Sequence, residues 1–147
     1  MTQLPFELLV GWDIVVIDDE IDSLDVANII LDFYGANVRT AENGRMGLNL
    51  IQTHKPTLLI TDLSMPEMDG WSLLRQLRDD PNMQNIPVIA LSAHAMVGDR
   101  ERALAAGFDG YITKPISADT FMEIFVEILK NIPILNGRLS IETEVKQ

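Results

Sequence analysis

The sequence contains no cysteine, which excludes a disulfide framework and a thiolate metal site. It also lacks any apolar run near the ~20 residues that a membrane-spanning helix needs, and its N-terminus has no basic segment followed by a long apolar one. Lysine and arginine are scarce, 11 against 22 acidic residues, and the net charge of −11 would repel a nucleic acid backbone. We therefore expect a cytoplasmic protein that binds neither membrane nor nucleic acid directly.

After residue 11 the sequence alternates short apolar runs with amphipathic stretches. This alternation is typical of repeated β-α units around a parallel sheet. The expected strands are Ile14 to Ile17, Asn37 to Ala41, Leu58 to Thr61, Val88 to Leu91 and Gly110 to Thr113. The 147 residues suit one α/β domain, a flavodoxin-like, doubly wound sheet of five parallel strands in the order 2-1-3-4-5 with helices on both faces.

The most informative stretch begins at the third expected strand. This strand ends in an acidic residue, Asp62, at the point where the chain leaves the sheet. Pro66 and Gly70 prevent an immediate helix, so Asp62 should lie beside a loop with exposed backbone. Because ligands of open α/β sheets bind beyond the carboxyl ends of the strands, Asp62 is a candidate for chemistry.

Polar residues also end three other strands. Asp18 and Asp19 follow the first strand, Ser92 the fourth, and Lys114 the fifth. In the expected order these strands are contiguous and ~4.8 Å apart, so Asp19 and Asp62 can approach to about 5 Å and Lys114 can reach back toward them. Crowded carboxylates need a cation, and oxygen ligands without cysteine or a nearby histidine favour Mg²⁺.

An Asp carboxylate, a divalent cation, an ammonium group and a hydroxyl group are the parts that hold a transferring phosphoryl group. Asp62 would attack in line, while the cation, Lys114 and Ser92 would stabilise the phosphoryl oxygens. Taken singly, Asp18 and Asp19 could instead cap a helix, Asp62 form a turn and Lys114 be solvated. Four independent coincidences at one edge of the sheet are less plausible than a single site.

In order and spacing, these residues resemble the receiver domain of two-component response regulators. The matching motifs are Asp18-Asp19, the Asp62-x-x-Met-Pro-x-Met-Asp-Gly run, Ser92-Ala93 and Lys114-Pro115-Ile116. The resemblance covers about Trp12 to Asn131. It predicts an N-terminal extension over residues 1–11, a receiver domain over 12–131 and a C-terminal tail over 132–147 without an effector domain, hence a stand-alone, single-domain response regulator.

The resemblance implies a role for each acidic residue of the site. Asp62 would be the phosphoacceptor. Asp19, Asp62 and the carbonyl of Ser64 would bind Mg²⁺, and Asp18 would act on the metal largely through water. A Mg²⁺-dependent phosphatase with an aspartyl-phosphate intermediate is the enzymatic alternative, but haloacid dehalogenases place a second Asp where this chain has Ser64.

The resemblance further implies that Lys114, joined to Pro115 by a cis peptide bond, clamps the phosphate, and that Ser92 and Tyr111 form a switch pair. Tyr111 alone would more often be a packing residue. The implied partners are a histidine kinase or histidine phosphotransfer protein and a downstream protein target. The chain would catalyse only its own phosphorylation and dephosphorylation, as a monomer or a phosphorylation-dependent dimer. An unphosphorylated scaffold would usually have lost the acceptor or the Lys, and both are present.

Overall fold

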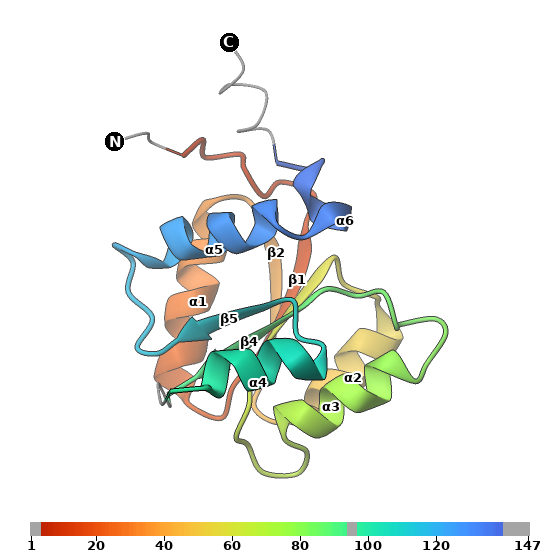
Figure 1. Cartoon of the computed structure of the whole chain (residues 1–147). Helices are drawn as coiled ribbons and strands as arrows, with labels where there is room; N and C mark the ends of the chain where they lie inside the picture. Colours follow the sequence, from red (N-terminus) through yellow and green to blue (C-terminus); the bar gives the residue numbers. More distant parts are fainter. Residues whose placement is uncertain (1–3, 94–96, 140–147) are drawn as a thin grey trace.

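The computed structural model describes residues 4–93 and 97–139. Its five parallel strands form one sheet in the order β2-β1-β3-β4-β5 (Figure 1). The elements are β1 (Asp13–Ile17), α1 (Ile21–Phe33), β2 (Asn37–Ala41), α2 (Gly44–Thr53), β3 (Leu58–Asp62), α3 (Gly70–Arg78), β4 (Val88–Ser92), α4 (Asp99–Ala106), β5 (Gly110–Thr113), α5 (Phe121–Lys130) and α6 (Pro133–Asn136). The expected sheet order is confirmed, and β1, β3 and β4 are each one residue longer than the sequence indicated.

The sheet is covered on both faces, because successive side chains of a strand point to opposite sides. Ile14 and Val16 of β1 belong to an apolar cluster with residues of α1 and α5. Val15 and Ile17 belong to a second cluster with residues of α2, α3 and α4. Figure 1 shows these two groups of helices on opposite sides of the sheet. The expected doubly wound architecture is therefore confirmed.

α4 buries little of its surface against the sheet. Only Asp99 and Ala103 of its eight residues are buried. Gly98 and Gly107 flank it in the left-handed conformation, with φ of 92° and 114°, which favours glycine at both ends. A helix with so little buried apolar surface is held weakly against the sheet.

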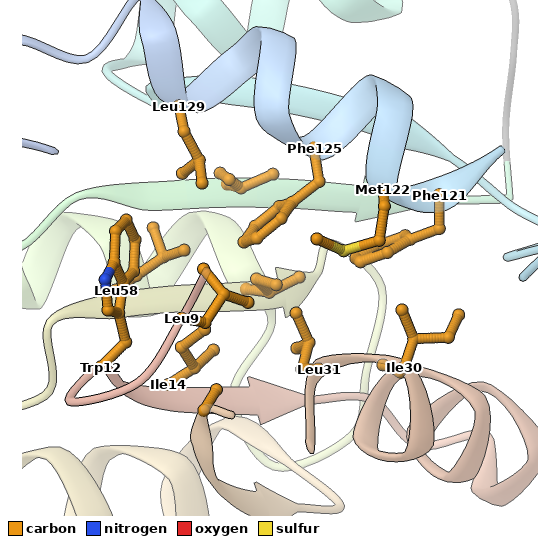
Figure 2. Close-up of a cluster of buried hydrophobic side chains, with 14 of the residues drawn as sticks. Leu9, Trp12, Ile14, Ile30, Leu31, Leu58, Phe121, Met122, Phe125 and Leu129 are labelled. Atoms are coloured by element: carbon orange, nitrogen blue, oxygen red, sulfur yellow. The ribbon is translucent and has the colours of Figure 1, made fainter. Parts of the chain in front are cut away.

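The segments on both sides of the predicted 12–131 domain pack into its core. Leu9, before β1, is fully buried in the core (Figure 2). Leu135 is buried as well, and it belongs to α6, a helix that the sequence analysis did not predict. The Arg138 guanidinium lies 5.3 Å from the Trp12 ring centroid, and Arg138 donates a hydrogen bond to the carbonyl of Gly11 at 3.3 Å. The two flanking segments therefore complete the first cluster, while residues 140–147 of the predicted tail lie outside the described part of the chain.

Within the residues that the structure describes, none of the helices combines the length and the apolar composition needed to cross a bilayer.

Candidate functional site

The strand register brings four polar residues to one edge of the sheet. Asp62, the last residue of β3, pairs with Leu91 of β4, and Ser92 follows that residue at the end of β4. Asp18 and Lys114 directly follow β1 and β5. All strands are parallel, so these residues leave the sheet at the same carboxyl edge.

The Lys114 ammonium group lies at the centre of this edge. Its Nζ is 2.9 Å from Asp18 Oδ2, 2.6 Å from Glu20 Oε1 and 3.2 Å from Asp62 Oδ2. Only 6% of the Lys114 side chain is exposed. The alternative of a solvated Lys114 is therefore wrong. Asp62 is 6% exposed and contacts Lys114, so forming a turn is not its only contact in the fold.

Glu20 is a member of the site that the sequence reasoning did not single out. Burial by itself lowers the pKa of Lys114, but the hydrogen bonds from Nζ to Glu20 and Asp18 and the nearby negative charges outweigh burial and raise it. The hydrogen bond with Lys114 also lowers the pKa of Glu20. The sequence feature that could have revealed Glu20 is its place as the third acidic residue of the Asp-Asp-Glu run. Its longer side chain extends to the same ammonium group as the aspartates.

Three carboxylates form a compact acidic cluster beside Lys114. Each of Asp18, Asp19 and Asp62 offers an oxygen, and these oxygens lie within 4.8 Å of one another. Asp18 Oδ1 accepts hydrogen bonds from the Glu20 N–H at 2.9 Å and from Lys114 at 3.1 Å. Asp18 Oδ2 is buried and close to the same ammonium, yet it is out of line for a hydrogen bond and has no donor among the described residues.

This donor set fits a small hard cation. Mg²⁺ prefers oxygen ligands and is commonly held by one or two carboxylates together with water or phosphate. Asp18 Oδ2, which has no hydrogen-bond donor among the described residues, supplies a lone pair of the kind that such an ion or its bound water takes up. The acidic cluster therefore matches the predicted metal site in residue type and in spacing.

Burial raises the pKa of Asp18 to about 6, because the charged carboxylate loses its hydration. The Glu20 N–H and Lys114 partly offset this effect, and the neighbouring Asp62 adds to it. Between the unfolded value of 3.8 and about 6 the folded protein binds more protons than the unfolded chain. In the absence of metal, the ionisation of Asp18 therefore lowers the free energy of unfolding as pH rises through this window.

We expect Asp18→Asn to stabilise the metal-free protein by about 1–3 kcal/mol at pH 8, and by less at pH 5, because asparagine cannot ionise. Urea unfolding of both proteins in EDTA at several pH values measures the difference. Asp25→Asn, on the exposed side of α1, is the matched control and should show no such pH dependence. An advantage for Asp18→Asn that is the same at pH 5 and pH 8 would contradict the assigned cause.

The loop after β3 is held close to Asp62. The Ser64 N–H donates to Asp62 Oδ1 at 3.3 Å, so the exposed Ser64 sits at the acceptor. A Cβ atom added to Gly70 would lie 2.4 Å from the Asp62 carbonyl oxygen, which explains why only glycine fits there. Asp69 Oδ1 accepts from the Ser72 N–H at 2.7 Å and caps α3. These contacts fix the backbone around the acceptor.

Ser92 and Tyr111 lie on the same face of the sheet, because Tyr111 pairs with Ala90 and Ser92 is two residues after Ala90 in β4. Ser92 is 3% exposed and lines a hollow of about 430 Å³ that Ser64 also lines. Tyr111 pairs with Ala90 in the sheet, is half-buried, and lines a separate hollow of about 430 Å³ beside Glu123 of α5. The structure thus places Ser92 with the acidic residues at the carboxyl edge and Tyr111 near the start of β5, packed against the cluster that includes α4.

Lys114 is followed by a cis peptide bond to Pro115. The Lys114 N–H donates to the Ser92 carbonyl at 2.8 Å, which extends the pairing of β4 and β5 to the site. A hollow of about 640 Å³ opens above Lys114, and Glu20, Ala93 and Pro115 line it. The ammonium group is therefore accessible from this side although most of its surface is covered.

Comparison with known proteins gives consistent matches. Residues 14–126 match the family described as the response regulator receiver domain. An uncharacterized 14.6 kDa protein from the sodA1 3′ region of Leptolyngbya boryana is 41% identical over 110 residues, covering 75% of this chain and 84% of the relative. The polar-differentiation response regulator DivK of Brucella anthropi is 34% identical over 110 residues, covering 75% and 89% of the two chains.

Solved structures agree with these matches. The signal receiver domain of a signal transduction histidine kinase from Syntrophus aciditrophicus has a TM-score of 0.71 and 30% sequence identity with this chain. The similarity covers 83% of this chain and 92% of that one. The residues 14–126 that match the family include all the strand ends that build the acidic edge.

Proposed function

Because the chain belongs to the response regulator receiver domain family, a signalling module of two-component phosphorelays, we propose that Asp62 accepts a phosphoryl group from a phosphohistidine of a partner protein. The observation that carries this proposal is the geometry of Lys114. Its buried ammonium group contacts Asp62 at 3.2 Å, beside two further aspartates that need a counter-charge. No structural role explains so costly a grouping of like charges.

In the proposed reaction, an Asp62 carboxylate oxygen attacks the phosphorus in line. A P–O bond forms, the P–N bond of the phosphohistidine breaks, and the leaving imidazole keeps the electron pair and takes up a proton. Lys114 neutralises a phosphoryl oxygen, and the Ser92 hydroxyl donates a hydrogen bond to another. The chain is not a turnover enzyme in this proposal, because the acyl phosphate forms and hydrolyses only on its own Asp62.

Mg²⁺ is the cofactor that we propose for the acidic cluster. Asp19, Asp62 and the Ser64 carbonyl would hold it directly, and Asp18 through water. When bound, the ion neutralises charge on the phosphoryl oxygens. The described oxygens within 4.8 Å of one another and the Asp18 oxygen without a donor support this assignment.

The partners that we propose are a histidine kinase or a histidine phosphotransfer protein as donor and a downstream protein target, which places the reaction in the cytoplasm. The hollow of about 640 Å³ above Lys114 provides an approach for the donor imidazole. A phosphatase acting on other substrates is less well supported, because Ser64 stands where that enzyme needs an acid. A scaffold role would leave the contact between Lys114 and Asp62 without a purpose.

The direct test is to incubate the chain with acetyl phosphate and Mg²⁺ and to locate the phosphate by mass spectrometry of its peptides. We expect one phosphate on the peptide that contains Asp62, released by hydroxylamine as an acyl phosphate is, and none when EDTA is present. Phosphate on a serine or threonine, or labelling that is indifferent to EDTA, would contradict the proposal.

We expect Lys114→Arg to slow phosphorylation by about 10- to 100-fold although the charge is kept, because a planar guanidinium cannot replace a compact ammonium among three carboxylates. Phosphorylation rates with acetyl phosphate measure the effect. Lys130→Arg in α5, where the lysine is 35% exposed and pairs with Glu127 at 3.5 Å, is the matched control. Equal phosphorylation rates for the two variants would mean that Lys114 contributes only its positive charge and not the shape of its ammonium group.

The face that we propose to report phosphorylation comprises α4, β5 and α5, reached through Ser92 and Tyr111. A phosphoryl group on Asp62 adds acceptor oxygens toward which Ser92 can move, and Tyr111 can fill the space that Ser92 leaves. Because few residues of α4 are buried, two arrangements of this helix against the sheet can be close in energy.

Amide hydrogen exchange with and without beryllofluoride and Mg²⁺ should therefore show changed protection in residues 97–111. Residues 44–53 of α2, which lie outside the proposed face, serve as the internal control. Changes limited to the loops at Asp18 and Asp62 would show that this face does not respond to the phosphoryl group.

A further inference from the structure

Four large apolar side chains remain exposed where α1 meets the turn before β1. They are Phe6, Val10, Ile29 and Phe33, and 58%, 61%, 69% and 60% of their respective surfaces are exposed. We call these four residues the α1 patch. The neighbouring Ile30 is only 7% exposed, so α1 already has a full apolar side for the core. The α1 patch is therefore additional apolar surface that the described fold does not use.

The α1 patch is one continuous surface. The Phe6 and Phe33 rings are in edge-to-face contact, with centroids 5.3 Å apart. Ile29 lies one helical turn before Phe33, on the same side of α1. Val10 lies against the backbone after α1, where a Cβ atom added to Gly35 would be 2.5 Å from Val10 Cγ2. Contiguous exposed apolar surface of this kind marks an interaction site more often than isolated apolar residues do.

The backbone beneath the α1 patch is firmly held. Leu8 and Leu9, between Phe6 and Val10, are buried in the core. The Leu9 N–H donates to the Tyr34 carbonyl at 2.9 Å, which ties the N-terminal turn to the end of α1. A surface that is already ordered loses little conformational entropy when a partner binds. Phe6 and Val10 also precede the residues 14–126 that match the family, so half of the α1 patch lies outside the family match.

The surroundings of the α1 patch are acidic. Residues 1–38 contain no lysine and no arginine. Glu7, Asp25 and Asp32 are exposed beside the apolar residues, at the N-terminal turn and on α1. A second copy of the chain would bring the same acidic residues against these, and an anionic membrane would be repelled. A surface with apolar residues flanked by cations complements both the apolar side chains of the α1 patch and the acidic residues around it.

We propose that the α1 patch binds a protein partner whose apolar surface is flanked by lysine or arginine. α1 begins beside the acidic edge at Ile21 and ends at Phe33, and its 13 residues span about 20 Å. A partner bound at the far end leaves Asp62 accessible, so this contact is independent of phosphorylation and of the proposed face at α4, β5 and α5. The α1 patch would thus anchor the chain to its assembly in either signalling state.

The probe is a synthetic peptide of about 18 residues that forms a helix with a leucine stripe flanked by lysines. Titration of the isotope-labelled full chain, followed by NMR, should shift amides centred on residues 5–11 and 26–35. Ile29→Lys should weaken binding by about tenfold or more, because it removes an apolar contact and repels the peptide. Lysine is a good helix former, so this variant should keep α1 intact.

Ile134→Lys is the matched control. It has the same substitution and the same change of net charge, and Ile134 is 61% exposed in α6, away from the α1 patch. We expect it to bind the peptide within about twofold of the unmodified chain. A peptide with glutamate in place of lysine should bind at least about tenfold more weakly than the lysine peptide.

Five results would overturn the proposal. Amide shifts centred on Asp18 to Asp22, or equal weakening by Ile29→Lys and Ile134→Lys, would mean general attraction to acidic surface. If the chain dimerises in sedimentation and Ile29→Lys abolishes the dimer, the partner at the α1 patch is a second copy of the chain. If the chain binds vesicles of phosphatidylcholine and phosphatidylserine and Ile29→Lys abolishes that binding, the patch binds a membrane. If deleting residues 140–147 shifts amides of the α1 patch, the patch binds the C-terminal end of the chain itself.

Discussion

Asp62→Asn is expected to abolish phosphorylation by acetyl phosphate while leaving the fold intact. Asparagine has nearly the same shape as aspartate, but its amide is not a nucleophile for phosphorus at neutral pH. The substitution also removes one of three crowded negative charges, so the metal-free protein should be at least as stable as before. The Lys114 ammonium group keeps Asp18 and Glu20 as partners, at 2.9 and 2.6 Å.

Intact-mass spectrometry after incubation with acetyl phosphate and Mg²⁺ measures the modification, and urea unfolding measures the stability. Asp79→Asn is the matched control, because Asp79 is an exposed residue at the end of α3. That variant should be phosphorylated like the unmodified chain. Phosphate that still appears on Asp62→Asn at the normal level would remove Asp62 from the mechanism, whereas loss of phosphorylation in both variants would point to a general effect of charge.

Leu9→Ala is expected to lower the free energy of unfolding by about 2–5 kcal/mol, because it opens a cavity in a fully buried part of the core. Val10→Ala, at the next residue, should change it by about 0.5 kcal/mol or less, since Val10 is 61% exposed. Urea unfolding monitored by tryptophan fluorescence measures both, and Trp12 in the same cluster reports on the region.

Similar effects of the two variants would mean that residues 1–11 form a dispensable extension. The larger effect of Leu9→Ala would instead place the start of the folding unit before residue 11. The same logic applies at the other end, where Leu135 is 1% exposed and belongs to the same cluster. The variants at Leu9 and Val10 test the predicted boundary at residue 11, and Leu135→Ala would test the boundary at residue 132 in the same way.

The arrangement at Lys114 shows where reasoning from strand ends was sufficient and where it was not. Each of Asp18, Asp62 and Lys114 adjoins a strand end, and parallel pairing of contiguous strands brings such ends together. The contact from Lys114 to Glu20 depends instead on how two long side chains extend in space. Sequence spacing carries no information about that choice of rotamer.

By itself, the sequence determined the strands, the doubly wound sheet order and the edge at which the polar residues meet. Buried strands are continuous apolar runs, and the residue at each strand end is fixed once the strand is placed. Only the tertiary structure decided that Ile30 is buried while Ile29 is exposed, because the rotation of α1 against the sheet separates two identical neighbours. It alone also placed Leu9 in the core, since an apolar residue in a turn has no periodicity that would reveal which surface covers it.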